Sequence, residues 1–310
     1  MSQPALAARI ASSANAQPFG RGRRRLEPYV WLMPVLLLLA GVLLYPWVSS
    51  LVFSFESWTP LRPIPARFVG LDNYLRLIQN QQFLAALQNT AVLVVATVLT
   101  QLVVGFGIAL LLNEIRVGRS VLLVMYLLPL MVTPSVIGLS WKLLLHDQWG
   151  VFNWALTSVG LPRIGWLSDP AWTIPTIVMV DVWQNMPFGV LVLLAGLQGI
   201  PDEQVEAAKI DGANSLQTFR HIVLPFLTPL ILITLLFRLI FALRTFDVIY
   251  SLFRSGGPAN SGMVIGVYLY EQLRTAWQIG QASATSYVLL MLTMLLASVF
   301  ILRWYRGAED

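Results

Sequence analysis

Residues 206–225 read EAAKIDGANSLQTFRHIVLP, a polar stretch that lies between two long apolar runs. Just before it, Pro201 suits the first turn of a helix, and Asp202 and Glu203 place negative charge at the positive end of the helix dipole. We therefore expect a short helix over about 201–210. A loop that only joins two apolar runs needs no such helix, so the stretch indicates coupling to a soluble partner.

A second short helix is expected after a bend. Gly212 supplies the permissive backbone that a sharp bend requires. Asn214 can cap the second helix, and Gln217 three residues later completes a capping-box pattern. Spacings of three and four residues gather four apolar side chains on one face of this helix: Leu216, Phe219, Ile222 and Val223. This stripe either meets a partner or packs beneath the protein's own helices, and both interpretations stay open.

The composition is that of an integral membrane protein. Of 310 residues, 57% are hydrophobic and 11% are charged, and the mean hydropathy is +0.70. Runs of about 20 apolar residues can cross a bilayer as helices, which satisfy their own backbone groups in lipid. We predict an all-α membrane protein with about six transmembrane helices, at 29–53, 84–112, 120–145, 172–199, 225–253 and 281–304. Kinks are expected at the helical prolines Pro129, Pro134, Pro175 and Pro187.

The domain organisation follows from the same pattern. Residues 1–28 are rich in Ala, Ser and Gln and end in a basic group, which predicts a flexible cytoplasmic tail before a transmembrane domain over 29–310. The first apolar run is longer than the core of a signal peptide and has no clear cleavage site after it, so we expect a retained span. With no cysteine and two histidines, the chain has almost no material for a metal centre, and we name no metal ligands.

Basic residues predict the orientation, because Lys and Arg near the ends of short loops stay in the cytoplasm. With the N-terminus inside, eleven basic residues are cytoplasmic: Arg9, Arg21, Arg23, Arg24, Arg25, Arg116, Arg119, Lys209, Arg220, Arg303 and Arg306. Seven lie outside: Arg62, Arg67, Arg76, Lys142, Arg163, Arg254 and Arg274. The count favours cytoplasmic termini and a cytoplasmic loop over 200–225. Because the basic residues lie beside apolar runs, the net charge of +5 indicates membrane orientation rather than nucleic-acid binding.

Polar residues inside predicted spans form a second informative set, because ionisable groups are costly in a bilayer. The fourth and fifth spans contain Asp181, Gln184, Asn185, Arg238, Arg244 and Asp247. Arg244 and Asp247 are three residues apart and are expected to pair on one helical face. Arg238 can reach Asp181 on the neighbouring span. These charges either line a transport path or only fix the packing of the helices, and we weigh the two equally.

The loop resembles that of a known family. One pattern is similar to the EAA loop of permease subunits in bacterial binding-protein-dependent ABC importers: Glu206, Ala207, Ala208, Gly212, Ile222, Leu224 and Pro225. Two stretches, PFGVLVLLAGLQGIP (187–201) and FRLIFALRTFDVIY (237–250), resemble the carbohydrate branch of these permeases. The resemblance begins near residue 28 and is nearest to the first permease of a maltose-type or glycerol-phosphate-type heterodimer. The chain lacks the very large second outer loop of the enteric maltose permease.

The resemblance implies a type I ABC importer permease fold in the bacterial inner membrane, with the EAA loop (200–225) as a coupling helix. A dimeric cytoplasmic ABC ATPase is implied to bind the loop through Glu206, Ala207, Ala208, Asp211, Gly212, Leu216, Phe219, Ile222 and Pro225. A second homologous permease would complete the path, and an extracytoplasmic solute-binding protein would deliver the solute. Because the chain has no GxxxxGK[ST] stretch, ATP and Mg are expected on the ATPase, and this subunit is expected to be no enzyme and to bind no cofactor.

A sugar or an oligosaccharide is the expected solute. Aromatic faces and neutral hydrogen-bonding groups bind sugars, which adds cavity candidates to the charged residues: Trp183, Gln184, Asn185, Tyr250, Ser283 and Tyr287. Trp183 and Tyr287 can equally serve as packing residues. Glycerol phosphate, its diesters and polyols remain alternatives, and an anionic solute would favour Arg244 as a ligand.

Two other classes of function remain open. A proton-coupled secondary carrier would also bury charges, but such carriers show internal repeats, and none is clear in this sequence. A membrane receptor or assembly protein could use the loop to hold a partner without transport. An enzyme is disfavoured because neither GxSxG nor HExxH occurs.

Overall fold

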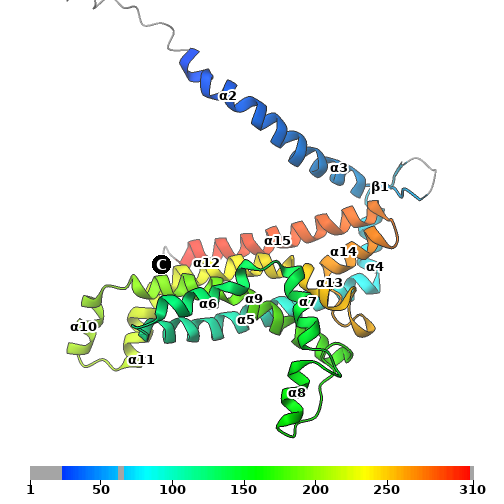
Figure 1. Cartoon of the computed structure of the whole chain (residues 1–310). Coiled ribbons are helices and arrows are strands. Elements are labelled where there is room, and N and C mark those ends of the chain that lie inside the picture. Colours follow the sequence, from blue (N-terminus) through cyan, green and yellow to red (C-terminus); the bar gives the residue numbers. More distant parts are fainter. Residues whose placement is uncertain (1–22, 62–65, 308–310) are drawn as a thin grey trace, which may run out of the picture. The chain divides into compact units, whose positions relative to one another are not determined.

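The computed structural model describes residues 23–61 and 66–307, and nearly all of them are helical (Figure 1). Residues 1–22 of the predicted tail lie outside the described part. The remainder of that tail is not a loop, because the first helix already begins at Arg23. The chain divides into two units, 1–52 and 53–310.

The first unit is a helical rod that exposes apolar side chains on every side from Trp31 to Val52. It contains α2 (Arg23–Leu39), the π-helical turn η1 (Ala40–Leu44) and most of α3 (Tyr45–Ser54). A helix that is apolar all round suits a lipid environment. Its segment Trp31–Ser54 is long and apolar enough to cross a membrane, in agreement with the predicted span 29–53.

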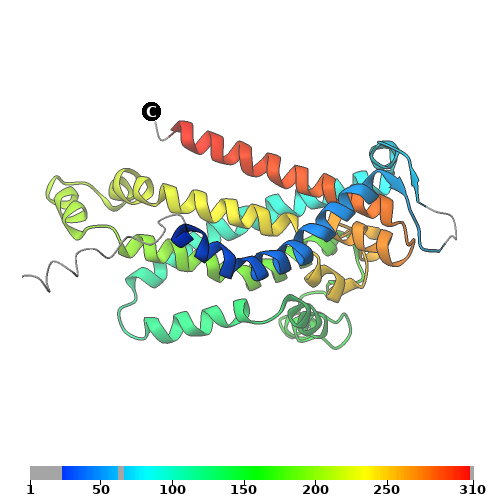
Figure 2. The same cartoon turned by 90° about the horizontal axis from the view of Figure 1, so that it is seen from above.

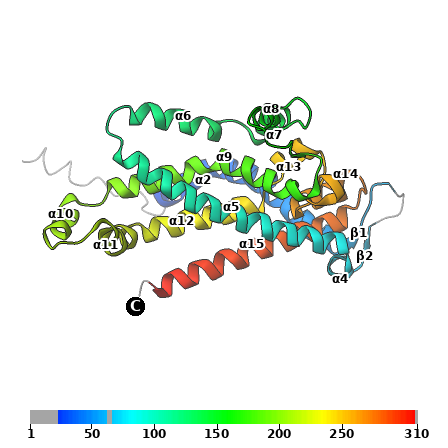
Figure 3. The ribbon, with the colours of Figure 1, turned by 90° about the horizontal axis from the view of Figure 1, so that it is seen from below.

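The second unit is built around α5 (Gln81–Glu114), α9 (Pro170–Gln198) and α12 (Leu224–Leu243). These helices run side by side (Figure 3) and share a core at the end that faces the polar loop: Ala109, Leu112, Val190, Leu193, Leu194, Leu197 and Leu227. Gly196 allows α9 to approach α12, because a Cβ at this position would lie 2.6 Å from Leu227 Cδ2. Small residues bring helix backbones close in membrane proteins in this way.

Local signals account for the ends of the long helices. Asn80 caps α5 by accepting hydrogen bonds from the backbone of Gln82 and Phe83, and Asp169 caps α9 by accepting one from Ala171. The observed helices α5, α9 and α15 (Ile279–Gly307) agree with the predicted spans 84–112, 172–199 and 281–304 within a few residues.

The predicted span 120–145 is broken at Pro134, one of the prolines that were expected to mark kinks. It consists of α6 (Arg119–Met131) and α7 (Pro134–Leu144), which are bent by 99° (Figure 2 and Figure 3). Pro134 causes the break, because proline lacks an N–H donor and pushes the residue before it out of the helical region. Thr133 accordingly has extended backbone angles. The other prolines expected to mark kinks lie inside helices: Pro129, Pro175 and Pro187.

The start of the predicted span 225–253 agrees with α12 (Leu224–Leu243), but its other end is wrong, because the helix stops at Leu243. One continuous helical run covers Ser215–Leu243: it starts with α11 (Ser215–Thr218), passes through the π-helical turn η2 (Phe219–Val223) and ends with α12. A new helix, α13 (Asp247–Phe253), follows a break. The break contains neither Pro nor Gly, so the sequence carries no local signal for it.

The two helices that follow the breaks pack against each other. A Cβ on Gly138 of α7 would lie 2.5 Å from Ser251 Cβ and 2.9 Å from the carbonyl oxygen of Val248 on α13. Only glycine allows this approach of the two helices. They share a core with α9: Ile137, Trp141, Leu145, Val180, Val248 and Leu252. The breaks in α6–α7 and α12–α13 therefore lie close together.

Short elements close the end opposite the polar loop. They are β1 (Glu56–Ser57), β2 (Arg67–Phe68), α4 (Asp72–Gln79), the 3₁₀ turn η3 (Pro258–Asn260) and α14 (Ile265–Arg274). Another short helix, α8 (Val151–Ser158), projects to one side beyond α7 (Figure 1). The strands pair antiparallel. Asn73 ties α4 to this strand pair, because its amide donates hydrogen bonds to the carbonyls of Ser54 at 2.9 Å and Glu56 at 3.0 Å.

Candidate functional site

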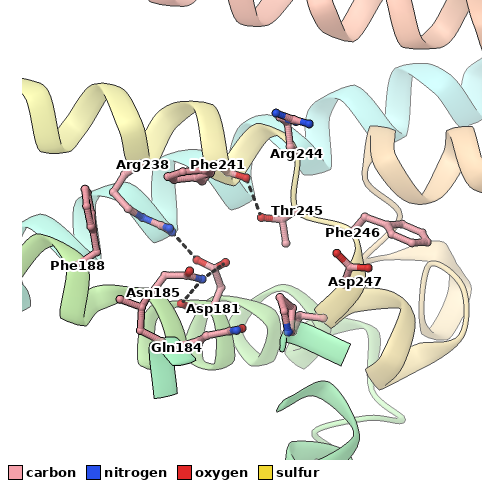
Figure 4. Close-up of a pocket in the computed structure, with 13 residues that line it drawn as sticks. Asp181, Gln184, Asn185, Phe188, Arg238, Phe241, Arg244, Thr245, Phe246 and Asp247 are labelled. Carbon is pink, nitrogen blue, oxygen red and sulfur yellow. Dashed lines mark hydrogen bonds and ion pairs between the residues drawn. The ribbon is translucent and has the colours of Figure 1, made fainter. Parts of the chain in front are cut away.

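A buried ion pair joins α9 to α12. Arg238 Nη2 lies 2.8 Å from Asp181 Oδ2, and each side chain is 5% exposed (Figure 4). The pairing proposed from the sequence is therefore confirmed. The free-energy cost of burying two charges in a membrane protein is reduced when they form an ion pair at hydrogen-bonding distance.

Further donors surround the Asp181 carboxylate. Asn185 donates to the Asp181 carbonyl and to Oδ1, both at 3.1 Å, one turn along α9. Gln101 of α5 donates to the Asp181 carbonyl and to Oδ2, both at 3.4 Å. The ion pair consequently ties together the three central helices, α5, α9 and α12.

A neighbouring amide supports the break in α6–α7. Gln184 Nε2 donates a 3.2 Å hydrogen bond to the carbonyl of Val132, which lies between the two helices. Interrupted helices survive in a membrane when other side chains satisfy the freed backbone groups. Gln184 thus has a structural role in addition to its place beside the charges.

A cavity of about 560 Å³ lies beside the ion pair, at the level of both helix breaks (Figure 4). It is lined by Leu130, Pro134, Asp181, Gln184, Asn185, Phe188, Arg238, Phe241, Arg244, Thr245, Phe246, Asp247 and Val248. We call this space the central cavity. Its size is within the range typical of small-molecule sites.

Polar atoms without partners lie at this cavity. Among the described residues, Arg238 Nε and Gln184 Oε1 are buried and make no hydrogen bond. A buried polar atom without a partner is costly, and a small shift of either side chain toward the cavity would let a ligand supply an acceptor for Nε and a donor for Oε1. Phe188, Phe241 and Phe246 add apolar ring faces to the lining.

The expected pair of Arg244 with Asp247 is not formed. Within the described part of the chain the two residues share no ion pair, and both are exposed. The prediction assumed one helical face, but the break after Leu243 separates the residues, and Figure 4 shows the Arg244 guanidinium directed away from Asp247. Thr245 supports the broken end of α12 by donating to the carbonyl of Phe241 at 3.3 Å. The four charges that line the cavity thus sum to zero.

The structure brings some predicted residues to the cavity and leaves others outside it. Asp181, Gln184, Asn185, Arg244 and Asp247 line it, whereas Trp183, Tyr250, Ser283 and Tyr287 do not. Thr245 and Phe246 could not be predicted, because the break that turns residues 244–248 toward the cavity has no sequence signal. Phe188 and Phe241 could not be predicted either, because an apolar residue inside an apolar span does not reveal which way it faces.

The four residues outside the cavity have other surroundings. Trp183 meets Trp141 edge to face, with ring centroids 5.4 Å apart. Tyr250 stacks on Phe246 and accepts a hydrogen bond from Arg274. Ser283 and Tyr287 are buried on α15.

The polar loop forms the second candidate site. Its first helix, α10 (Asp202–Ile210), has nearly the predicted bounds. Gly212 adopts a left-handed φ of 80°, its N–H donates to the Lys209 carbonyl at 3.1 Å, and the N–H of Ala213 donates to the Ala208 carbonyl at 2.9 Å. This pair of bonds is a Schellman motif, which ends a helix and usually requires glycine at the left-handed position. The predicted bend at Gly212 is confirmed.

The predicted capping box is confirmed as well. The backbone N–H of Gln217 donates to Asn214 Oδ1 at 2.9 Å, and the backbone N–H of Asn214 donates to Gln217 Oε1 at 2.8 Å. Both sides of the bend at Gly212 are therefore fixed by local hydrogen bonds. The second helix is the start of the continuous run to Leu243, so the loop is joined directly to α12.

The apolar stripe of the second loop helix is partly packed on the protein's own helices and partly exposed. Phe219 meets Phe106 of α5 edge to face at 5.7 Å, and Val223 packs against the core beside it. In contrast, Leu216 is 75% exposed and Ile210 is 85% exposed. The other loop residues named from the sequence lie on the surface or are half-buried: Glu206, Ala207, Ala208, Asp211, Ile222 and Pro225. One part of the stripe packs on the chain itself, and the other part is open to a partner.

Sequence comparison identifies the family. Residues 25–308 match the model of the binding-protein-dependent transport system inner membrane component. The chain belongs to this family. It is thus a multi-pass membrane permease of an ABC importer and no enzyme.

Relatives of this permease cover most of its length. The trehalose/maltose transport system permease protein MalF of Thermococcus litoralis is 33% identical over 276 residues, which make up 88% of this chain and 92% of the relative. The sulfoquinovosyl glycerol transport system permease protein SmoG of Agrobacterium fabrum is 34% identical over 278 residues, 89% of this chain and 90% of the relative.

A solved structure shares the fold of this permease. A chain in the crystal structure of a bacterial ABC transporter involved in the import of the acidic polysaccharide alginate superposes with a TM-score of 0.80. The two sequences are 24% identical, and the match covers 92% of this chain and 96% of the other. The type I importer permease fold expected from the sequence is confirmed.

Reversing one charge of the ion pair should destabilise the permease. We expect Asp181→Arg or Arg238→Asp alone to lower the free energy of unfolding by about 3–5 kcal/mol, because each leaves like charges together in the interior. The double reversal should recover most of the loss, since Gln101 and Asn185 can turn their amide oxygens toward an arginine. Titration with SDS in mixed micelles measures these changes.

The exposed pair of Asp72 with Arg76, at 2.7 Å, provides the matched control. Reversal of either charge there should cost less than about 1 kcal/mol, because water screens exposed pairs. A double reversal at 181 and 238 that is as unstable as the sum of the single variants would contradict the pairing.

Proposed function

We propose that this permease imports a sugar or an oligosaccharide. The relatives described above are named for trehalose and maltose and for sulfoquinovosyl glycerol, all of which contain a sugar. The central cavity supports the same class of solute. It offers amide groups for hydroxyls and phenylalanine rings for the apolar face of a pyranose, and its four charges sum to zero.

The observation that carries the proposal is the combination of a neutral charge balance with unsatisfied polar atoms. Arg238 Nε and Gln184 Oε1 offer one donor and one acceptor, which the hydroxyl groups of a sugar can satisfy together. Glycerol phosphate and polyols also carry hydroxyl groups and are second candidates. A phosphate, with Arg244 as its ligand, would bring negative charge into a cavity whose lining charges already sum to zero.

ATP hydrolysis on a separate subunit is the proposed source of energy. The chain has no phosphate-binding loop of its own, so ATP and Mg would bind to a dimeric cytoplasmic ATPase. The exposed Ile210 and Leu216 would fill an apolar groove on that ATPase, and Glu206 would pair with a basic residue beside it. The Schellman motif at Gly212 would hold the two short helices at a fixed angle for this contact.

The remaining partners follow from the proposed machinery. A second homologous permease would complete the translocation path, and a solute-binding protein would deliver the sugar, in keeping with the name of the family. Both termini and the loop would lie in the cytoplasm of a bacterium, as the distribution of basic residues indicates. A proton-coupled carrier is the less supported alternative.

Uptake by the reconstituted transporter tests the proposed function. In proteoliposomes that contain both permeases and the ATPase, with the solute-binding protein added, we expect ATP-dependent uptake of at least one of radiolabelled maltose, trehalose and arabinotriose. A protonophore should not reduce it. Uptake of glycerol 3-phosphate alone, or uptake that needs a proton gradient and no ATP, would contradict the proposal.

A substitution at Gly212 tests the coupling role of the loop. Gly212→Val should cost about 1–2 kcal/mol or more, because a branched side chain opposes the left-handed backbone. A Cβ there meets no atom within 4 Å, so the cost is conformational rather than steric. We expect uptake to fall about five- to thirty-fold while the amount of permease in the membrane is unchanged.

Gly212→Asn provides the matched control, because asparagine tolerates the left-handed region. This variant should retain most of the uptake and most of the stimulation of the ATPase by loaded binding protein. Wild-type uptake in Gly212→Val would show that the geometry of this bend does not matter for coupling.

A further inference from the structure

A second polar cleft lies at the end of the molecule opposite the loop. It consists of two adjoining cavities of about 410 Å³ and about 370 Å³, which share Ala276, Gln278 and Gln281. The first cavity lies between β1, α4 and the start of α15, and the second between the start of α5, η3 and α14. We call the two together the amide cleft, after its most frequent side chains: Asn73, Asn80, Gln82, Asn260, Gln272, Gln278 and Gln281.

Several of these amides are free to bind a ligand. In the described part of the chain, the side chains of Gln82, Gln278 and Gln281 make no hydrogen bond. Gln272 is buried, with 6% exposed, and its Oε1 accepts a hydrogen bond from Thr285 Oγ1 at 2.8 Å. Its Nε2 makes only a poorly aligned contact with the Tyr268 hydroxyl. A donor held this weakly would gain from a better acceptor, and both residues line the second cavity.

Backbone strain concentrates around the same cleft. Among the described residues other than glycine, four have a positive φ: Arg254, Ala259, Asn260 and Trp277. Asn260 lines the cleft, and each of the others is next in sequence to a residue that lines it. Residues other than glycine are uncommon in this region, and they gather at sites where function justifies the strain.

The charges of the cleft disfavour an anionic ligand. Glu56 and Glu271 are both at its surface, and among the described lining residues Arg76 alone is basic and is engaged with Asp72 at 2.7 Å. An acid bound here would face two carboxylates. Amides, in contrast, offer a donor and an acceptor each, which matches neighbouring hydroxyl groups, and Trp58 adds an aromatic face.

We propose that the amide cleft is a second solute site, separate from the central cavity, and that it binds a neutral polyhydroxylated solute, a saccharide. Under the orientation proposed above, the cleft lies on the outer side, where a sugar leaving the solute-binding protein would meet it before entering the path. This inference rests on the proposed function as a sugar importer. It adds a binding step in which Gln278 and Gln281 contact the hydroxyl groups directly and Gln272 donates from beneath.

The absence of cysteine from the sequence allows a direct test. A single cysteine at Thr59→Cys, in the lining of the first cavity, is labelled with an environment-sensitive dye in the complete transporter without binding protein. Maltose, trehalose and arabinotriose are titrated in turn. We expect a saturable change in fluorescence with the saccharide that the proteoliposomes take up. Gln281→Leu and Gln278→Leu should each weaken this binding at least five-fold.

Two controls separate this site from the central cavity and from nonspecific effects. Asn185→Leu, in the central cavity, should abolish uptake and leave the titration unchanged. Gln148→Leu, an exposed amide outside the cleft, should change neither. Circular dichroism confirms that each variant is folded.

Three results would overturn the inference. No saturable signal with a saccharide that the transporter imports would exclude the cleft as a solute site. Tighter binding of an acidic saccharide such as galacturonic acid would contradict the neutral class. Cleft variants that raise only the KM for loaded binding protein, with direct binding intact, would show a docking surface instead. If no saccharide is imported at all, the proposed function fails first, and the uptake assay reveals this independently.

Discussion

The ion pair between Asp181 and Arg238 is the interaction on which this structure depends. Neither charge can remain alone in the interior of a membrane protein, so α9 and α12 must keep the distance and the rotation that bring them together. Gln101 brings α5 into the same arrangement. The helices held in this way are also the helices that enter and leave the polar loop, because α9 ends at Gln198 and the run to Leu243 begins at Ser215. A movement of the loop would therefore act on the helices that carry the pair.

The two helix breaks create the central cavity beside this pair. At each break the helix ends, the chain turns, and a side chain donates to a carbonyl at the helix end: Gln184 to Val132, and Thr245 to Phe241, which also accepts from the N–H of Arg244. The helices after the breaks, α7 and α13, meet at Gly138 and are packed as one piece. The cavity thus lies between α9, α12 and the two breaks that lead into α7 and α13.

Local chemistry and charge were predictable from the sequence, whereas the direction of side chains was not. The capping box at Asn214, the bend at Gly212 and the break at Pro134 each depend on a few neighbouring residues. The pair of Asp181 with Arg238 was predictable because few other partners are available in lipid. The break after Leu243 depends on packing between distant helices and has no local signal, so Arg244 and Asp247 were expected to pair and Phe246 was missed. Trp183 and Tyr250 were placed in the cavity by residue type, but the rotation of their helices turns them away from it.

The most direct test asks whether the central cavity is part of a water-filled path. Because the chain has no cysteine, Thr245→Cys introduces a single thiol at the lining. In nanodiscs that contain the complete transporter, a charged thiol reagent should modify this cysteine, and a saturating concentration of the transported sugar should slow the reaction. Ser215→Cys, on the exposed loop, should react at the same rate with and without sugar. If Thr245→Cys does not react in any nucleotide state while Ser215→Cys reacts fully, the cavity is closed to water and the account is wrong.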